Sequence, residues 1–277
     1  KFGFNYVSNN VNDIFLNKKI NCVFIASRHD SHSGYVLNAL KNNKNVFCEK
    51  PLCINMRELE EIKKLKKDKD NISLMVGFNR RFSPLIEVIS KLLEEINQPK
   101  NFLITVNAGF IDPEDWTQNI ITGGGRVIGE ACHFIDLLIH LSGSKIINSK
   151  INILQNQINM PEINDNVTIS LNFDDGSLGV INYFSNGHNM YPKEKLEIFT
   201  NGKVILLDDF KSLKTWGFPR FNKKSLIFQN KGQTECIQRF INSIKQGKDL
   251  ISFDDIYEVS KNAIIISEKI RNFSNVN

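Results

Sequence analysis

The stretch Asn45-Val46-Phe47-Cys48-Glu49-Lys50-Pro51 places a lysine where a short apolar strand ends. Open α/β sheets bind ligands in the crevice outside the carboxyl ends of their strands, so a side chain at this position can face a ligand. The proline restricts the residue before it and permits a cis peptide bond. The alternative interpretation is a solvated lysine at a strand end, which is the better one for an isolated Lys-Pro pair.

The residues around this stretch predict a parallel sheet built from β-α-β units. Residues 21–27 form a continuous apolar run, typical of a strand buried on both faces. A helix over residues 31–43 follows, with Ser31 as a possible cap. Asn55 and Glu58 resemble a capping box that begins a helix reaching about Lys67. A strand over 72–76 and a helix beginning at Ser83-Pro84 complete this part.

From about residue 100 onward, the pattern changes to successive strands joined by tight turns, which predicts an antiparallel sheet. The predicted strands are 101–108, 147–154, 167–173, 178–184, 195–199 and 203–207. Hairpin turns are expected at 174–177 and at Asn201-Gly202, whose residues tolerate positive φ. The predicted helices are 129–141, ended by Gly143, then 234–245 and 254–272.

Composition excludes several classes of protein. The 277 residues are 41% hydrophobic, and 35 basic against 30 acidic residues give a net charge of +5 without the basic block typical of nucleic-acid binding. No apolar run approaches the roughly 18 residues of a membrane span. The cysteines at 22, 48, 53, 132 and 236 lack metal-ligand or disulfide spacing, which favours the cytoplasm and predicts no metal site.

Three stretches together resemble the glucose-fructose and inositol oxidoreductase family (Gfo/Idh/MocA). Glu49-Lys50-Pro51 after a strand is similar to the family signature in which the lysine stands beside the nicotinamide. Residues 26–32 resemble the loop under the cofactor ribose and nicotinamide. Residues 123–136 resemble the glycine-rich loop that leads into the helix carrying the catalytic histidine. The resemblance covers nearly the whole chain, in the family's order and spacing.

The resemblance implies a fold of α/β plus α+β class. Residues 1–82 would be the second part of a Rossmann nucleotide-binding domain. Residues 83–277 would be a substrate domain on a mostly antiparallel sheet, with the last helix packing back on the first domain. The open face of that sheet would serve formation of a homo-oligomer.

The site residues are predicted in three groups. The catalytic pair is Lys50 and His133. The cofactor-binding group is Ala26, Ser27, Arg28, His29, His32, Glu49, Lys50, Pro51, Asn79 and Arg81. The substrate-binding group is Lys50, Trp116, Arg126, Glu130 and His133. His188 and Lys193 are further candidates to reach the substrate pocket.

His133 is the candidate base because the pKa of histidine lies nearest neutrality and a carboxylate can orient its ring. Glu130 and Asp136 each lie three residues away, on roughly the same helical face. The alternative is a core histidine with a structural partner. Many family members carry an aspartate four residues before the histidine, where this chain has Gly129. Either Glu130 substitutes for that aspartate, or Lys50 alone steadies the reacting oxygen.

The chain lacks the Gly-x-Gly-x-x-Gly turn that holds the pyrophosphate of a dinucleotide. With a first residue that is not methionine, this absence favours a truncated domain over one that never had the turn. The choice between NAD and NADP therefore stays open. Runs 76–84, 107–111 and 124–137 resemble a branch fused behind a zinc-dependent alcohol-dehydrogenase-like module, associated with surface-polysaccharide or amino-sugar pathways.

These observations predict an NAD(P)-dependent dehydrogenase acting on a secondary alcohol of a sugar, nucleotide sugar or cyclitol. His133 would take the hydroxyl proton, and Lys50 would steady the oxygen. The isolated chain is expected to be inactive without a phosphate-binding turn. The alternative is a non-catalytic sugar-binding or regulatory module, which the missing turn and Gly129 favour.

Overall fold

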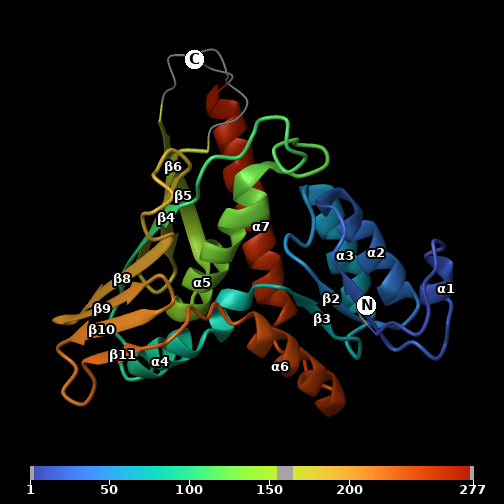
Figure 1. Cartoon of the computed structure of the whole chain (residues 1–277), viewed down its shortest axis with the longest axis horizontal. Helices are drawn as coiled ribbons and strands as arrows, with labels where there is room; N and C mark the ends of the chain where they lie inside the picture. Colours follow the sequence, from blue (N-terminus) through green and yellow to red (C-terminus); the bar gives the residue numbers. More distant parts are fainter. Residues whose placement is uncertain (1–2, 155–164, 275–277) are drawn as a thin grey trace.

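The first part of the chain forms a small parallel sheet with helices beside it. The computed structural model describes residues 3–154 and 165–274. Strands β1 (Cys22–Ile25), β2 (Asn45–Cys48) and β3 (Leu74–Val76) pair in the order β1-β2-β3. The helices of this part are α1 (Asn12–Phe15), α2 (His29–Lys41) and α3 (Met56–Lys67), on the right in Figure 1. The predicted β-α-β arrangement is confirmed.

Local sequence signals explain most of these boundaries. The Oδ1 of Asn55 accepts a hydrogen bond of 3.0 Å from the backbone N–H of Glu58, which caps α3 as predicted. Two expectations were wrong. β1 is an edge strand on which Phe24 is 50% exposed, so it is not buried on both faces. Helix α2 begins at His29, and the Oγ of Ser31 donates to the carbonyl of Arg28 in place of capping the helix.

The second part is built on an eight-stranded sheet with the order β11-β10-β9-β8-β4-β7-β6-β5. Its strands are β4 (Asn101–Asn107), β5 (Ile146–Ile153), β6 (Val167–Phe173), β7 (Leu178–Phe184), β8 (Glu194–Thr200), β9 (Lys203–Asp208), β10 (Ser212–Trp216) and β11 (Lys223–Ser225). All neighbours are antiparallel except β4 and β7. The mostly antiparallel sheet is confirmed, and β10 and β11 were not predicted.

Helices pack against one face of this sheet or against the first part, where the ring of Phe240 contacts Phe24 and Phe47. They are α4 (Pro84–Leu93), α5 (Cys132–Ser142), α6 (Gln233–Gln246) and α7 (Phe253–Ser274). The long α7 contacts α5 and β5 on one side and α3 and β3 on the other, and it runs between the two parts in Figure 1. Alternating burial along β6 and β8 shows that one sheet face forms the core under these helices.

The segment before α5 departs from the predicted helix over 129–141. A π-helical turn, η2 (Val127–Ala131), precedes α5. A short 3-10 helix, η1 (Asn79–Phe82), occupies the predicted loop after β3. Gly143 ends α5 with a φ of 67°, as expected for a left-handed helix end.

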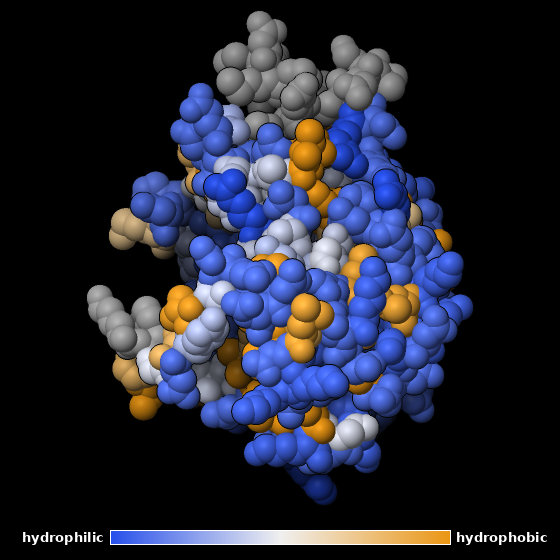
Figure 2. Space-filling view, turned by 90° about the vertical axis from the view of Figure 1, so that its right-hand side faces the viewer, coloured by the Kyte–Doolittle hydropathy of each residue, from blue (hydrophilic) through white to orange (hydrophobic). Residues whose placement is uncertain are grey.

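The surface of the first part is mostly hydrophilic, with hydrophobic side chains scattered over it (Figure 2). In residues 3–154 and 165–274, no helix is long and apolar enough to cross a membrane. The same residues contain no group of three or more histidine, cysteine, aspartate or glutamate side chains placed to hold a metal ion.

Candidate active site

Lys50 lies at the carboxyl end of β2. Open α/β sheets bind ligands outside the carboxyl ends of their strands, so a ligand-facing side chain is expected there. The peptide bond between Lys50 and Pro51 is cis. The Nζ of Lys50 donates a 2.6 Å hydrogen bond to the carbonyl of Gly129. Lys50 lines a cavity of about 280 Å³ between the two parts of the chain. The other predicted site residues that line it are His29, Trp116, Arg126, Glu130 and His133.

His133 lines this cavity with a buried imidazole ring. Its Nδ1 makes no hydrogen bond within the described part of the chain. Burial, together with the positive charges of Arg80 and Lys50, holds the pKa of His133 well below its ordinary value. The ring is therefore neutral at pH 7 and has a lone pair that can accept a proton.

The expectation that Glu130 or Asp136 orients His133 was wrong. Asp136 accepts two hydrogen bonds from Arg81, at 2.5 and 3.1 Å. Glu130 lies in the π-helical turn. The i to i+5 hydrogen bonds of this turn change the angle between successive side chains, so Glu130 and His133, three residues apart, do not share a face as they would on an α-helix. Glu130 consequently faces other partners, and Lys50 bonds to a backbone carbonyl in place of a carboxylate.

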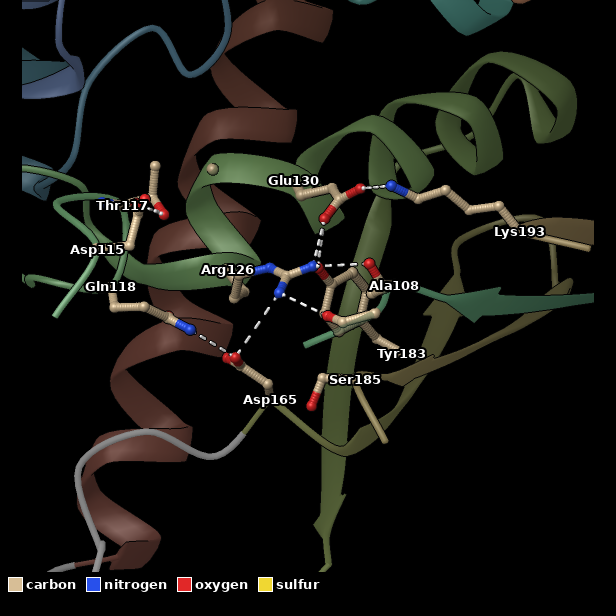
Figure 3. Close-up of polar contacts among 12 residues, drawn as sticks. Ala108, Asp115, Thr117, Gln118, Arg126, Glu130, Asp165, Tyr183, Ser185 and Lys193 are labelled. Carbon is tan, nitrogen blue, oxygen red and sulfur yellow. Dashed lines mark hydrogen bonds and ion pairs between the residues drawn. The ribbon is translucent and has the colours of Figure 1, made fainter. Parts of the chain in front are cut away.

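Glu130 is held by three donors at one side of the cavity (Figure 3). Its carboxylate accepts hydrogen bonds from the Nη2 of Arg126 at 2.8 Å and from the hydroxyl of Tyr183 at 2.5 Å. The Nζ of Lys193 lies 2.7 Å from its other oxygen. Burial alone would raise the pKa of Glu130, but Lys193, Tyr183 and Arg126 lower it to about 2. Glu130 is therefore ionised at neutral pH.

Replacing Glu130 with glutamine is expected to destabilise the protein by about 2 kcal/mol at pH 7, because charge-assisted hydrogen bonds are lost. The folded pKa of about 2 lies below the ordinary value of 4.5, so this contribution is present above pH 4.5 and declines as the pH falls toward 2. Urea unfolding at pH 7 and pH 4 measures it. The exposed pair of Glu61 with Arg57 provides the control, since Glu61→Gln should cost below about 0.5 kcal/mol. Equal effects of the two variants would contradict this role of Glu130.

His29 and Trp116 form the aromatic side of the cavity. Their ring centroids lie 4.8 Å apart in an edge-to-face arrangement, and Arg28 lies over the Trp116 ring at 5.6 Å. The Nδ1 of His29 lies 2.7 Å from the carbonyl oxygen of Gly123. Burial lowers the pKa of His29 to about 4. A Cβ at Gly129 would lie 3.1 Å from the Cε1 of His29, so His29 occupies the space beside the position of the family aspartate.

Several predicted cofactor-binding residues do not line this cavity. His32 is fully buried, with its ring nitrogens 2.7 Å from the carbonyl oxygen of Pro51 and 3.0 Å from that of Ser27. It joins two loops and exposes no atom to a ligand. Arg81 is buried in its ion pair with Asp136, and the side-chain amide of Asn79 donates to the carbonyl of Lys231.

The remaining candidates lie at the rim or on the surface. Ala26, Ser27 and Arg28 are exposed after β1, and the carboxylate of Glu49 packs against Gly77. His188 is exposed and accepts a hydrogen bond from the backbone N–H of Met190.

Arg80 was missed by the sequence analysis, although it lines the cavity. Its guanidinium donates two hydrogen bonds of 2.8 Å to Glu194 and lies over the ring of Phe134. The two adjacent arginines after β3 indicated a site residue, but the sequence analysis assigned Arg81 to the cofactor and not Arg80. Thr117 and Ile111 from the long loop before η2 also line the cavity and were not predicted.

A parallel sheet that presents a lysine at its strand ends, joined to an antiparallel sheet part that supplies a neutral histidine, places the chain among the α/β proteins that bind a ligand at the carboxyl ends of their strands. Residues 1–78 match the family model of the Gfo/Idh/MocA oxidoreductases with an NAD-binding Rossmann fold. Residues 92–203 match the C-terminal α/β domain model of the same family. The chain belongs to the Gfo/Idh/MocA oxidoreductase family.

Individual relatives agree with this assignment. The chain is 30% identical to the uncharacterized oxidoreductase YrbE of Bacillus subtilis over 64% of this chain and 52% of that protein. It is 25% identical to myo-inositol 2-dehydrogenase of Thermotoga maritima, over 76% of this chain and 63% of that protein. A solved levoglucosan dehydrogenase, in complex with NADH and levoglucosan, has a TM-score of 0.83 at 23% identity, covering 98% of this chain and 84% of that one.

The family assignment confirms the predicted nicotinamide cofactor, since the first model describes an NAD-binding fold. The chain spans about half to two thirds of the length of these curated relatives. The predicted domain boundary after residue 82, the fusion to an alcohol-dehydrogenase-like module and the cytoplasmic location stay predictions.

Proposed function

We propose that the protein containing this chain transfers a hydride between NAD(P) and a secondary alcohol of a sugar, nucleotide sugar or cyclitol. The observation that carries the proposal is the presence of Lys50 and the neutral His133 in one cavity at the carboxyl end of β2. Myo-inositol 2-dehydrogenase and levoglucosan dehydrogenase among the relatives support this substrate class.

The chain's own residues would divide the work as follows. His133 accepts the proton of the substrate hydroxyl on a ring nitrogen. The ammonium of Lys50 uses one N–H on the carbonyl of Gly129 and has two left for the substrate oxygen, whose negative charge it stabilises. The bound nicotinamide would supply the acceptor for the hydride that leaves the carbinol carbon.

The residues present fit the nicotinamide end of such a cofactor. His29, Lys50 and Trp116 surround an open cavity, and the buried Nδ1 of His133 has no partner within the described residues. Trp116 and His29 offer flat apolar surfaces, and Lys50 offers free donors beside them. The backbone carbonyl of Gly129 takes the place of the missing aspartate as the acceptor for Lys50.

The direct test incubates the full-length protein with NAD or NADP and a panel of sugars, nucleotide sugars and cyclitols, and follows absorbance of the reduced nicotinamide. Turnover of any member supports the proposal. Saturable sugar binding without binding of either cofactor would favour the non-catalytic module.

Replacing His133 with asparagine is expected to lower turnover by at least about 100-fold, because a positioned general base is lost. Affinity for the cofactor should stay unchanged, since the amide fills part of the same volume. The control is His188→Asn, which changes an exposed histidine outside the cavity lining. Normal turnover in the His133→Asn variant would contradict the role of His133 as a base and would favour a purely structural role.

We also propose that the protein forms a homo-oligomer through the uncovered face of the eight-stranded sheet. Phe199 and Trp216 are large hydrophobic side chains exposed on β8 and β10. Sedimentation of the full-length protein tests this proposal, and a monomer at all concentrations would contradict it.

A further inference from the structure

The cavity carries more positive than negative side chains. Among the described residues, each of two carboxylates is shared by two cations: Glu130 by Arg126 and Lys193, and Glu194 by Arg80 and Lys231. A third carboxylate, Asp165, lies 3.8 Å from Arg126. Within the same part of the chain, Lys50 has only a backbone carbonyl as its partner.

Unused donors lie on Arg126, which lines the cavity, and on Lys193, which pairs with the cavity-lining Glu130. The side chain of Arg126 is 4% exposed, and its Nε makes no hydrogen bond within the described residues. Lys193 follows the connection between β7 and β8, and its side chain is 42% exposed. Its ammonium bonds to Glu130 and keeps further N–H groups free. Both side chains therefore have donors that no acceptor among the described residues satisfies.

We infer that the substrate carries an anionic substituent, a carboxylate or a phosphate ester, which Lys193 and Arg126 bind beside Glu130. This inference rests on the proposed function and narrows its substrate class. A neutral sugar offers hydroxyl groups that each donate and accept, whereas the free groups here are donors only. An anionic oxygen accepts from both side chains at once in charge-assisted bonds.

Glu130 does not oppose such a ligand. Its charge already lies between those of Arg126 and Lys193, at 2.8 and 2.7 Å, and Tyr183 donates a third bond to it. With Asp165 beside Arg126, the charges of this cluster balance, and the surplus positive charge comes from Lys50 and from the two cations that share Glu194. Glu130 then acts as a fixed bridge that holds Arg126 and Lys193 at one side of the cavity (Figure 3).

The test compares matched probes by isothermal titration calorimetry on the full-length protein with NADH present. Glucuronate is compared with its neutral amide, glucuronamide, and glucose 6-phosphate is compared with glucose. At least one anionic probe should bind about tenfold or more tightly than its neutral partner, the factor expected for a charge-assisted hydrogen bond. The two comparisons separate a carboxylate from a phosphate. Anionic probes that bind no better than the neutral ones overturn the inference.

Replacing Lys193 with methionine should lower the ratio of affinities for the anionic and the neutral probe by about tenfold. The matched control is Lys195→Met. Lys195 lies two residues away with a similar exposure of 38%, but it pairs with Glu197 and not with the cavity-lining Glu130. The control should keep the full preference, and an equal loss in both variants would contradict a specific role of Lys193.

The same samples separate this inference from the proposed function. Preferential binding of an anionic probe without hydride transfer from any alcohol would leave the inference in place and reject the function. Turnover of neutral and anionic substrates with equal KM would reject the inference and keep the function.

Discussion

Replacing Lys50 with methionine is expected to lower the turnover of the full-length protein by about 10³-fold, because one preorganised charge donor to the developing alkoxide is lost. Methionine keeps an unbranched apolar side chain, so the cis Pro51 loop and the cavity wall should persist. Cofactor affinity should remain unchanged, because the proposed contact of Lys50 is with the reacting oxygen of the substrate. Steady-state rates and a separate titration with NADH measure the two effects.

The buried Lys44 provides the control for this experiment. The Nζ of Lys44 also donates to backbone carbonyls, those of Asn17 and Ile20, but Lys44 does not line the cavity. Lys44→Met should lower stability and leave turnover per folded molecule unchanged. Normal turnover in Lys50→Met would remove Lys50 from the reaction and leave His133 without the proposed partner.

The elements that could be predicted from sequence are those whose local pattern agrees with their environment. The strands 167–173 and 178–184 were predicted with their observed limits, because alternating hydrophobic residues flank the turn at Gly176, which has a φ of 84°. β11 has no buried residue, so no hydrophobic pattern marks it. Edge strands of this kind form through pairing with a neighbour, here β10.

The placement of Lys50 and His133 in one cavity could be predicted because sequence motifs place both at element ends. Lys50 follows β2, and His133 lies in the first turn of α5. The distinction between Arg80 and Arg81 could not be predicted. Adjacent residues in a short 3-10 helix point in different directions, and their partners, Glu194 and Asp136, lie far along the chain. Local sequence contains no information about which arginine meets which carboxylate.

Because they pair with different carboxylates, Arg80 and Arg81 connect different elements of the fold. Arg80 reaches the cavity and joins η1 to β8 through Glu194. Arg81 joins η1 to α5 through Asp136, and its Nη1 lies 3.7 Å from Asp255 on α7. Because α5 carries His133 and η1 follows β3, the Arg81 pair fixes the position of the histidine helix relative to the lysine sheet.

Replacing Arg81 with leucine is therefore expected to destabilise the protein by about 3–5 kcal/mol at pH 7.5, because it leaves the Asp136 carboxylate buried without its partner. The side chains of Arg81 and Asp136 are 6% and 1% exposed, so solvent cannot replace the lost contacts. Urea unfolding of the variant and the original protein measures the difference in the free energy of unfolding.

The penalty should depend on pH in a defined direction. Burial raises the pKa of Asp136 from its ordinary value of 3.8 to about 6 even though Arg81 opposes the shift, so without Arg81 it should rise further. A carboxyl whose folded pKa exceeds its unfolded pKa does not lower the free energy of unfolding at a pH below the unfolded pKa. Its destabilising effect grows as the pH rises toward the folded pKa. Arg81→Leu should therefore lose less stability at pH 4 than at pH 7.5.

A double variant separates the charge effect from lost packing. Arg81→Leu with Asp136→Leu removes both buried charges, and replacing a whole buried ion pair with apolar side chains is often neutral. The double variant should recover most of the stability that Arg81→Leu loses at pH 7.5, and its own free energy of unfolding should no longer depend on pH through position 136. If the double variant is as unstable as the single one at both pH values, packing of the arginine stem and not its charge holds α5 in place.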